Sequence, residues 1–266
     1  MTISGSAGGS ALGVVLRTTP LRESDLLVVL LTAEHGRITA VARGGRKSQR
    51  RFAGALQLLV LGRYQLGRPP RGELWNLENA DIVREWHALA SDVVAVAHAS
   101  YVAELAGALL PTETPEPHAV ELIVALWDTL AAGGPSPAVL RTIEIALLDL
   151  AGHRPALDAC AACGRAELDA AVFDPIRGGA ICRTCAAISR TAGVRPIEAG
   201  ALAYLRAAAA VDAPSEARAL DSDPRFAPGE RTAARDALVA MAQHLIGKPL
   251  KSLEYIAKLA SAGRKP

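Results

Sequence analysis

The four cysteines of this 266-residue chain constrain its fold more than any other feature of the sequence. They form two Cys-x-x-Cys pairs, Cys160 with Cys163 and Cys182 with Cys185, and eighteen residues separate the pairs. Two thiolates at this spacing can bind one metal ion, and the separation is typical of a zinc ribbon or knuckle. The pattern therefore predicts one compact module, closed around a single Zn²⁺ ion.

The predicted zinc site is structural. Gly164 follows the first pair, and Gly178 and Gly179 precede the second, as tight backbone turns around a metal require. Four thiolates complete a tetrahedral site and leave no position open for a substrate. No His-x-Glu precedes either pair, which excludes the signature of the zinc deaminases. The alternatives to zinc are four ordinary buried thiols or redox-active pairs.

The composition favours folded domains, because half of the residues are hydrophobic and 21% are charged. Residues 1–10 lack the basic start and apolar run of a secretory signal, and we expect a disordered lead-in there. The most apolar stretch, 93–110, contains His98 and Glu104 and fits a buried helix better than a membrane span. We therefore expect a cytoplasmic protein without a membrane partner, in which thiols stay reduced.

Positive charge is concentrated in the first part of the chain. Residues 1–71 hold eleven Lys or Arg and three Asp or Glu, a net of +8, which leaves −6 for residues 72–266 because the whole chain carries +2. Nine basic residues and no acidic one lie between 37 and 71. This pattern predicts a nucleic-acid partner, since ordinary surfaces mix charges of both signs. The candidate DNA-binding residues are Arg37, Arg43, Arg46, Lys47, Arg50 and Arg51.

The basic segment belongs to a predicted all-β domain. Short runs rich in Val, Leu and Ile predict strands at 11–18, 26–32, 37–43, 56–66 and 73–83. Five short strands fit a small barrel such as the OB-fold. Alternation places Arg37 and Arg43 on the outer face of the third strand. Phe52 and Trp75 either stack on bases or pack in the core, and with so few aromatics we expect phosphate contacts to dominate the affinity.

After residue 84 the pattern becomes helical. Apolar spacing predicts helices at 92–110, 119–132 and 231–246, and a helix that Ser136 caps, Pro137 begins and Gly152 ends. We expect a loop at 212–230, with Asp221 and Asp223 as turn residues. The predicted fold is an α+β multi-domain protein. Its expected parts are the lead-in 1–10, the OB domain 11–83, the helical domain 84–156 with 190–266, and the zinc module 157–189.

Catalytic motifs do not emerge from the sequence. Gly247-Lys248 is followed by Pro249, which excludes a Walker A loop, and no Gly-x-Gly-x-x-Gly opens a helix. We therefore expect a binding protein rather than an enzyme. Two alternatives stay open at this point: a metal-dependent nuclease or other DNA-processing enzyme, and an RNA- or ribosome-associated protein with an OB domain and a zinc module.

Several segments resemble one known family in the same order along the chain. The longest is 13–56, with the turns Glu23-Ser24-Asp25 and Glu34-His35-Gly36, the strand end Val41-Ala42-Arg43-Gly44, and Phe52-Ala53-Gly54. The helix Arg141-x-x-Glu144-x-x-Leu147-Leu148, the four cysteines and the segment 247–252 follow. Over 13–252 the chain resembles the RecO family of bacterial recombination mediators, and this shared order is more specific than any single motif.

The resemblance implies a nucleoid-associated DNA repair and recombination protein of the RecFOR pathway. Family members bind single- and double-stranded DNA, anneal complementary strands, work with RecR, bind the single-stranded-DNA-binding protein (SSB) and help to load RecA. The resemblance also implies that the helical domain binds the acidic, apolar C-terminal tail of SSB.

The candidate for the tail's carboxylate is Arg141, because a guanidinium group binds a carboxylate through two hydrogen bonds. On the same predicted helix, 139–151, the stripe of Leu140, Ile143, Leu147 and Leu150 can supply apolar surface. The alternative is that the stripe is only core and Arg141 only a solvated residue.

Overall fold

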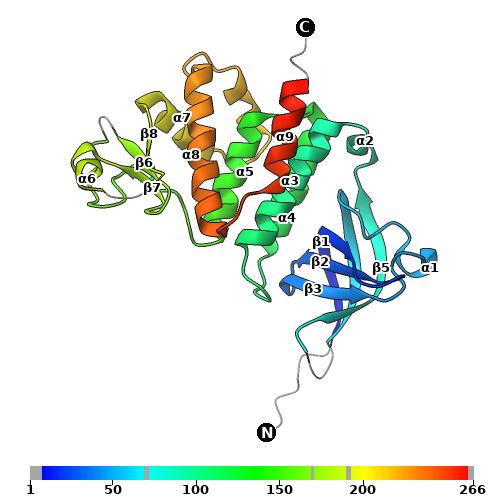
Figure 1. Ribbon diagram of the computed structural model, residues 1–266. Coiled ribbons are helices and arrows are strands. Elements are labelled where there is room, and N and C mark those ends of the chain that lie inside the picture. Colours follow the sequence, from blue (N-terminus) through cyan, green and yellow to red (C-terminus); the bar gives the residue numbers. More distant parts are fainter. Residues whose placement is uncertain (1–7, 69–71, 169–170, 190–192, 263–266) are drawn as a thin grey trace. The chain divides into compact units, whose positions relative to one another are not determined.

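The computed structural model describes residues 8–68, 72–168, 171–189 and 193–262 (Figure 1). The chain divides into two compact units, which are treated one at a time below: unit 1 comprises 1–134 with 252–266, and unit 2 comprises 135–251. The helical segments of the expected domain division are shared between these units, so that division stays a proposal. Most of the expected lead-in lies outside the described residues, but the carbonyl of Gly9 already accepts a hydrogen bond from Leu66 N.

Unit 1 begins with a closed five-stranded barrel, which confirms the predicted OB-type fold. Its strands are β1 (Ser10–Pro20), β2 (Leu26–Thr32), β3 (Gly36–Ala42), β4 (Val60–Gly67) and β5 (Trp75–Glu85), with the short helix α1 (Gln49–Phe52) after β3. The order around the barrel is β1-β2-β3-β5-β4. All neighbours are antiparallel except β3 and β5, which pair in parallel over three residues.

Alternation of side chains explains the barrel core. Along β3 every second residue is buried, so Ile38, Ala40 and Ala42 face inward while the residues between them are half-buried. Phe52 and Trp75 are also core residues, 2% and 3% exposed. The fourth strand begins at Val60 and not at residue 56 as expected. Left-handed backbone at Leu59 (φ 66°) is incompatible with an extended strand that runs through this residue.

Helices complete unit 1. They are α2 (His87–Ala90), α3 (Val93–Leu109), α4 (Pro117–Gly133) and α9 (Lys251–Ala262). The Asp92 carboxylate caps α3 by accepting hydrogen bonds from the backbone N–H groups of Val94 and Ala95. α3 packs on β1, where Gly107 lies against Leu16. The Glu104 carboxylate of α3 accepts hydrogen bonds from the N–H and hydroxyl of Ser252, and this fixes the start of α9.

Unit 2 contains the remaining helices and a small sheet. Its elements are α5 (Pro137–Leu150), β6 (Val172–Asp174), β7 (Gly179–Ile181), α6 (Arg183–Ile188), β8 (Arg195–Pro196), α7 (Ala199–Ala209), the 3₁₀ helix η1 (Glu216–Asp221) and α8 (Pro228–Ile246). The sheet has the order β7-β6-β8. α5 packs against η1, α7 and α8, and it lies beside α8 in Figure 1. Most of its side chains are buried. The structure confirms that Ser136 caps α5 and that Pro137 is the first residue of this helix.

The segment 212–230 is not simply the expected loop, because it contains η1. Asp221 also does more than form a turn. Its carboxylate accepts hydrogen bonds from the hydroxyl of Ser136 at 2.6 Å and from the backbone N–H of Ala138 at 2.9 Å. A negative charge at the N-terminus of α5 satisfies N–H groups that lack partners within the helix and interacts favourably with the helix dipole. The segment 212–230 therefore holds the start of α5 in place.

A buried ion pair lies within α5. Arg141 Nε donates to Glu144 Oε2 at 2.6 Å, and Arg141 Nη2 donates to Glu144 Oε1. The two side chains are only 5% and 2% exposed. Charges are expensive to remove from water, so each partner is tolerated there because of the other. Burial also raises the pKa of the neighbouring Tyr204 to about 12.

In the ranges that the structure describes, no helix is both long and apolar enough to cross a membrane.

Removing one member of the buried pair should destabilise unit 2 strongly. We expect Glu144→Ala to lower the free energy of unfolding by about 3–5 kcal/mol, because it leaves a buried guanidinium without its carboxylate. Urea unfolding followed by circular dichroism measures the change. The matched control is Asp149→Ala on the same helix. Its partner Arg154 is exposed, and exposed pairs contribute about 1 kcal/mol or less. Equal stability of the two variants would contradict the expectation.

Candidate metal centre and nucleic-acid interface

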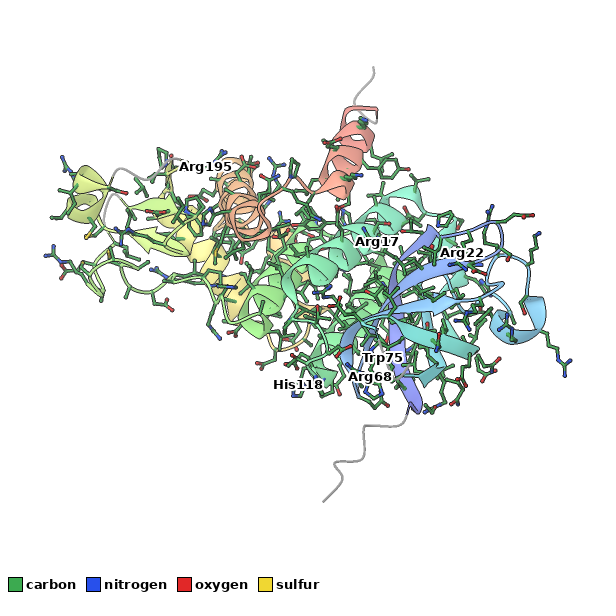
Figure 2. All side chains as sticks on the ribbon, turned by 60° about the horizontal axis from the view of Figure 1, so that its bottom comes forward. Arg17, Arg22, Arg68, Trp75, His118 and Arg195 are labelled. Carbon is green, nitrogen blue, oxygen red and sulfur yellow. The ribbon has the colours of Figure 1, made fainter. Side chains whose placement is uncertain are left out.

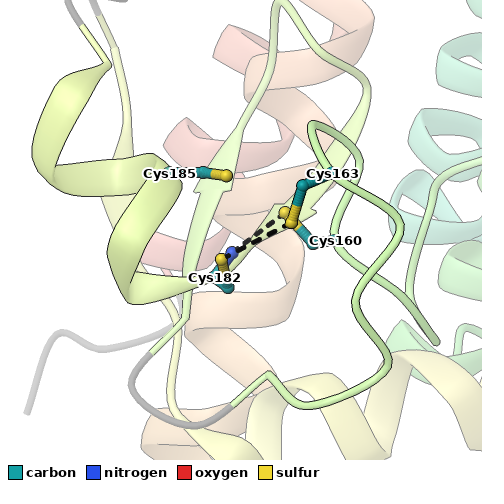
Figure 3. Close-up of side chains that lie close together, drawn as sticks. All are labelled: Cys160, Cys163, Cys182 and Cys185. Atoms are coloured by element: carbon teal, nitrogen blue, oxygen red, sulfur yellow. Dashed lines mark hydrogen bonds between the residues drawn. The ribbon is translucent and has the colours of Figure 1, made fainter.

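The four cysteines lie together in unit 2, as the sequence predicts. Their Sγ atoms all lie within 4.8 Å of one another (Figure 3). Cys163 Sγ lies 3.9 Å from Cys182 Sγ, which is far beyond the length of a disulfide, about 2.05 Å. Zinc–sulfur bonds of about 2.3 Å place the sulfurs of a tetrahedral site about 3.8 Å apart. The cluster therefore has dimensions at which four thiolates can hold one metal ion.

Backbone hydrogen bonds bring the two pairs together. The N–H of Gly164 donates to Cys160 O at 2.8 Å, and Gly164 has the left-handed φ of 73° that closes this turn. On the other side, Ala161 N donates to Ala180 O at 2.8 Å, which joins the first pair to β7. At Gly179 a Cβ atom would lie 2.4 Å from Ala156 O, so only glycine permits this approach.

The pKa values of three of the thiols are shifted, and not all in the same direction. Burial raises the pKa of Cys160. Hydrogen bonds from backbone N–H groups, of which the N–H of Cys182 has the largest effect, outweigh burial and lower this pKa to about 6. The backbone N–H of Cys185 likewise lowers the pKa of Cys182. By contrast, the side chains of Cys163 and Cys182 raise the pKa of Cys185 to about 12. Crowded thiolates repel one another, and a bound cation is what allows all four to ionise.

Most of the candidate DNA-binding residues gather after β3. Arg43, Arg46, Lys47 and Arg50 are exposed, and Arg51 is half-buried beside them. The turn that carries them is docked on the β1–β2 turn. Gly44 N donates to the Asp25 carboxylate at 2.8 Å, and Arg46 N donates to Ser24 O at 3.0 Å. The charges therefore project from a fixed backbone rather than from a flexible loop.

Arg51 has a different part in this surface. Its Nη2 donates to Arg43 O and its Nε to Ser48 Oγ, while its guanidinium lies 4.9 Å from the centre of the Phe52 ring. The side chain therefore holds the turn in shape, besides contributing charge. Next to it lies a hollow that is lined by Val41, Arg43, Arg51, Asn76, Leu77 and Glu78.

Arg37 is separated from this group, at the other end of β3. Its Nε donates to Leu110 O at 2.8 Å and its Nη2 to Thr112 Oγ1 at 2.5 Å. Partial burial lowers the pKa of its guanidinium. Arg37 therefore contacts the segment that follows α3, which the sequence pattern did not indicate.

The structure corrects the expected environment of Arg141. We expected an exposed cation or a solvated helix residue, but the side chain is buried and paired with Glu144. Leu140, Ile143 and Leu147 of the apolar stripe are core residues as well. Burial follows because η1, α7 and α8 surround α5, and the sequence pattern could not reveal these neighbours. The binding of an SSB tail at Arg141 stays a prediction.

The basic surface also includes residues outside the acid-free run. Arg22 lies in the β1–β2 turn on which the basic segment is docked, and Arg17 lies on β1; both are exposed and are labelled in Figure 2. They lie outside the uninterrupted basic run because the acidic residues Glu23 and Asp25 follow them. Asp25 binds the backbone of the basic turn, and Glu23 forms an exposed ion pair with Lys47 at 3.5 Å. The contacts of the basic turn with Ser24 and Asp25 are the signal that points to Arg22.

Comparison with known proteins agrees with these features. Two family models match the chain: recombination protein O N terminal over residues 10–86, and recombination protein O C terminal over residues 90–254. Curated relatives that are named DNA repair protein RecO include one from Anaeromyxobacter sp. strain K, which is 41% identical over 92% of this chain and 94% of its own. One from Myxococcus xanthus is 35% identical over 92% and 96%. The RecO of Symbiobacterium thermophilum is also 35% identical, over 94% and 97%.

Each match spans nearly the whole length of both chains, and the two family models together cover the barrel and the helical part. With its closed N-terminal barrel and four-cysteine cluster, the chain belongs to the RecO family, and its role lies in DNA repair and recombination.

Proposed function

We propose that this protein is a non-enzymatic recombination mediator that binds single- and double-stranded DNA and anneals complementary strands. With RecR it helps to load RecA onto DNA that is coated with SSB. The observation that supports the DNA-binding part most directly is a set of exposed cations after β3: Arg43, Arg46 and Lys47 on the fixed turn, and Arg50 in α1. Such a set can contact several phosphates, and phosphate contacts bind every sequence alike.

The described carboxylates support binding rather than cleavage. The acidic residues of 212–230 were the nearest approach to a catalytic pair in the sequence. Asp221 accepts hydrogen bonds at the start of α5, and Asp223 forms an ion pair with Arg225 at 2.7 Å. Within the part of the chain that the structure describes, the cluster of potential metal ligands is the four cysteines alone. A two-metal nuclease site, by contrast, needs oxygen ligands.

We propose that the metal is one structural Zn²⁺ ion per chain, held by Cys160, Cys163, Cys182 and Cys185. Sulfur ligands in a tetrahedral set favour zinc over Mg²⁺ or Ca²⁺, which prefer oxygen. When bound, the ion cross-links the two Cys-x-x-Cys turns and has no position open for a substrate.

The partner proteins RecR, SSB and RecA are proposed from the family alone. For SSB, the acidic C-terminal tail remains the proposed ligand and Arg141 its proposed contact. Because Glu144 already accepts both hydrogen bonds of the Arg141 fork, a tail carboxylate would have to displace this buried partner. Binding at Arg141 thus requires α5 to rearrange. A DNA partner also places the protein with the nucleoid in the cytoplasm.

Annealing should occur without cleavage. We expect the protein to accelerate pairing of labelled complementary oligonucleotides that are coated with SSB, with or without divalent metal ions. Gel electrophoresis under native and denaturing conditions separates annealed from cleaved products. Metal-dependent cleavage would support the nuclease alternative instead. Tighter binding of RNA than of DNA of the same sequence at fixed salt would support the RNA-associated alternative.

The contribution of Arg50 to DNA binding should be electrostatic. We expect Arg50→Ala to weaken binding to unrelated sequences equally and to reduce the slope of log K against log salt by about one. Fluorescence anisotropy over a salt series measures both quantities. The matched control is Arg235→Ala on α8, an exposed arginine paired with Asp236, which should leave the slope unchanged. A loss confined to some sequences would indicate base recognition.

Loss of a single cysteine should reveal the metal. Metal analysis should find about one zinc per chain, and Cys163→Ser should release it. Because Cys163 is exposed, the substitution removes little packing, so a fall in Tm would report lost metal binding. Ala162→Ser, its exposed neighbour, is the control. A Cys163→Ser protein without zinc but with the Tm of the control would contradict a structural role for the metal.

A further inference from the structure

The segment that follows α3 lies on the barrel and covers some of its cationic groups. This strap, residues 110–114, joins α3 to the chain leading into α4. Its backbone pairs with β3, since Glu113 N donates to Arg37 O at 2.9 Å and Thr112 forms a parallel bridge with Arg37. In return, Arg37 donates to the strap at Leu110 and Thr112. The strap is therefore bound to β3 through both backbone and side chain.

The Glu34-His35-Gly36 turn is shaped for this contact. A Cβ atom at position 36 would lie 1.8 Å from Thr114 O, and Gly36 has a φ of 63°. Glycine is thus required both for the turn and for the approach of the strap. On the strap, Glu113 itself has a φ of 56°, which is unfavourable for a residue with a side chain. This unfavourable conformation aims the Glu113 carboxylate at the barrel.

The Glu113 carboxylate accepts two hydrogen bonds from the barrel. Arg68 Nη2 donates to Oε2 at 2.8 Å, and the indole Nε1 of Trp75 donates to Oε1 at 2.8 Å. The Arg68 guanidinium lies 5.0 Å from the centre of the Trp75 ring, and Figure 2 shows the two side chains next to each other. The ring of His35 also packs against the ring of Trp75, with 4.8 Å between the two ring centroids. The hydrogen bond from Trp75 lowers the pKa of Glu113, as does Arg68, so the carboxylate is anionic.

An arginine and an indole N–H that converge on one oxyanion form a site that phosphate also fits. Both ligands present anionic oxygens to the same donors, and a guanidinium binds either one through its planar fork. The ion pair is accessible, because the Arg68 and Glu113 side chains are 39% and 31% exposed. Arg68 also belongs to the acid-free basic run of the sequence, although it was not among the candidate DNA contacts.

We propose that Arg68 and Trp75 form a binding site for a backbone phosphate of DNA, and that Glu113 occupies this site in the free protein. DNA must then displace the strap's carboxylate before this site contributes to binding. The inference rests on the proposed DNA-binding function, and it adds a contact that competes with the protein's own side chain. In the free protein Glu113 blocks this contact, whereas the exposed cations after β3 can bind DNA without any displacement.

The test compares four proteins: the wild type, Glu113→Gln, Arg68→Ala and the double variant. Glutamine keeps an acceptor for Trp75 Nε1 and removes the charge that holds Arg68. We expect Glu113→Gln to bind a single-stranded oligonucleotide about tenfold more tightly, with a log–log salt slope steeper by about 0.9. The gain should disappear when Arg68 is also replaced. Fluorescence anisotropy over a salt series provides both numbers.

Two controls separate this site from general effects of charge. Glu116→Gln makes the same change in net charge three residues further along the chain. The Glu116 side chain forms no capping hydrogen bond with α4, so this substitution should change the affinity for DNA much less. The proposal is overturned if Glu113→Gln binds no better than Glu116→Gln, or if its gain persists without Arg68. Arg50→Ala distinguishes the two levels of inference. If it weakens binding while Glu113→Gln does not strengthen it, only the strap site fails, whereas no effect of Arg50→Ala undermines the proposed DNA interface.

A measurement on the wild type keeps the proposal testable should Glu113→Gln fold poorly. Displacement of Glu113 changes the hydrogen bond of the Trp75 indole, so DNA should shift the tryptophan emission of the wild type. Trp75→Phe should remove that shift, because Trp86 and Trp127 are buried beside each other elsewhere in unit 1. An identical shift in Trp75→Phe, or no shift at saturating DNA, would show that the carboxylate stays in place and would reject the proposal.

Discussion

The barrel closes through a short parallel pairing of β3 with β5, and the candidate DNA surface is arranged around it. Only three residue pairs form this ladder, from Ala40 with Trp75 to Ala42 with Leu77. At one end of the ladder, β3 leads into the basic turn that is docked on the β1–β2 turn. At the other end, Trp75 meets the strap. If this pairing opened, both cationic regions would lose the backbone that positions them. Of the residues that form the ladder, Trp75 is the one that also belongs to a cationic region.

The segment around the four cysteines, the proposed zinc module, depends on a different kind of constraint. Its strands β6 and β7 have three residues each, and β8, which pairs with β6 from outside residues 157–189, has two; such strands are too short for an independently stable sheet. Among the described residues, the local core consists of Cys160, Ile181 and Cys182, with partly buried side chains such as Leu168 and Val172 packed against it. A metal ion is the usual means by which so small a module becomes rigid. Ligand binding and folding are therefore expected to be one process here.

The sequence predicted those parts of the fold that local periodicity determines. The strand at 26–32 and the helices at 92–110 and 119–132 were found because alternation or helical spacing marks them directly. The small strands β6, β7 and β8 were missed, since two or three residues carry no periodic signal. For the candidate site, spacing alone brought the four cysteines together correctly. The expected environment of Arg141 was wrong, and the position of Glu113 was not predicted. Both depend on contacts with segments that are far away in the sequence.

Because α9 belongs to unit 1, unit 1 can be completed only after unit 2 has been synthesised. Ser252 hydrogen-bonds to Glu104 of α3, so a helix that follows unit 2 in the sequence belongs to unit 1. Unit 2 is thus an insertion within unit 1 and is connected to it twice, after residue 134 and before residue 252. On the ribosome, unit 2 emerges complete before unit 1 has received its last helix. A nascent chain therefore carries the barrel and α3 with an unfilled docking position, and Glu104 lacks its Ser252 partner until synthesis has passed residue 252.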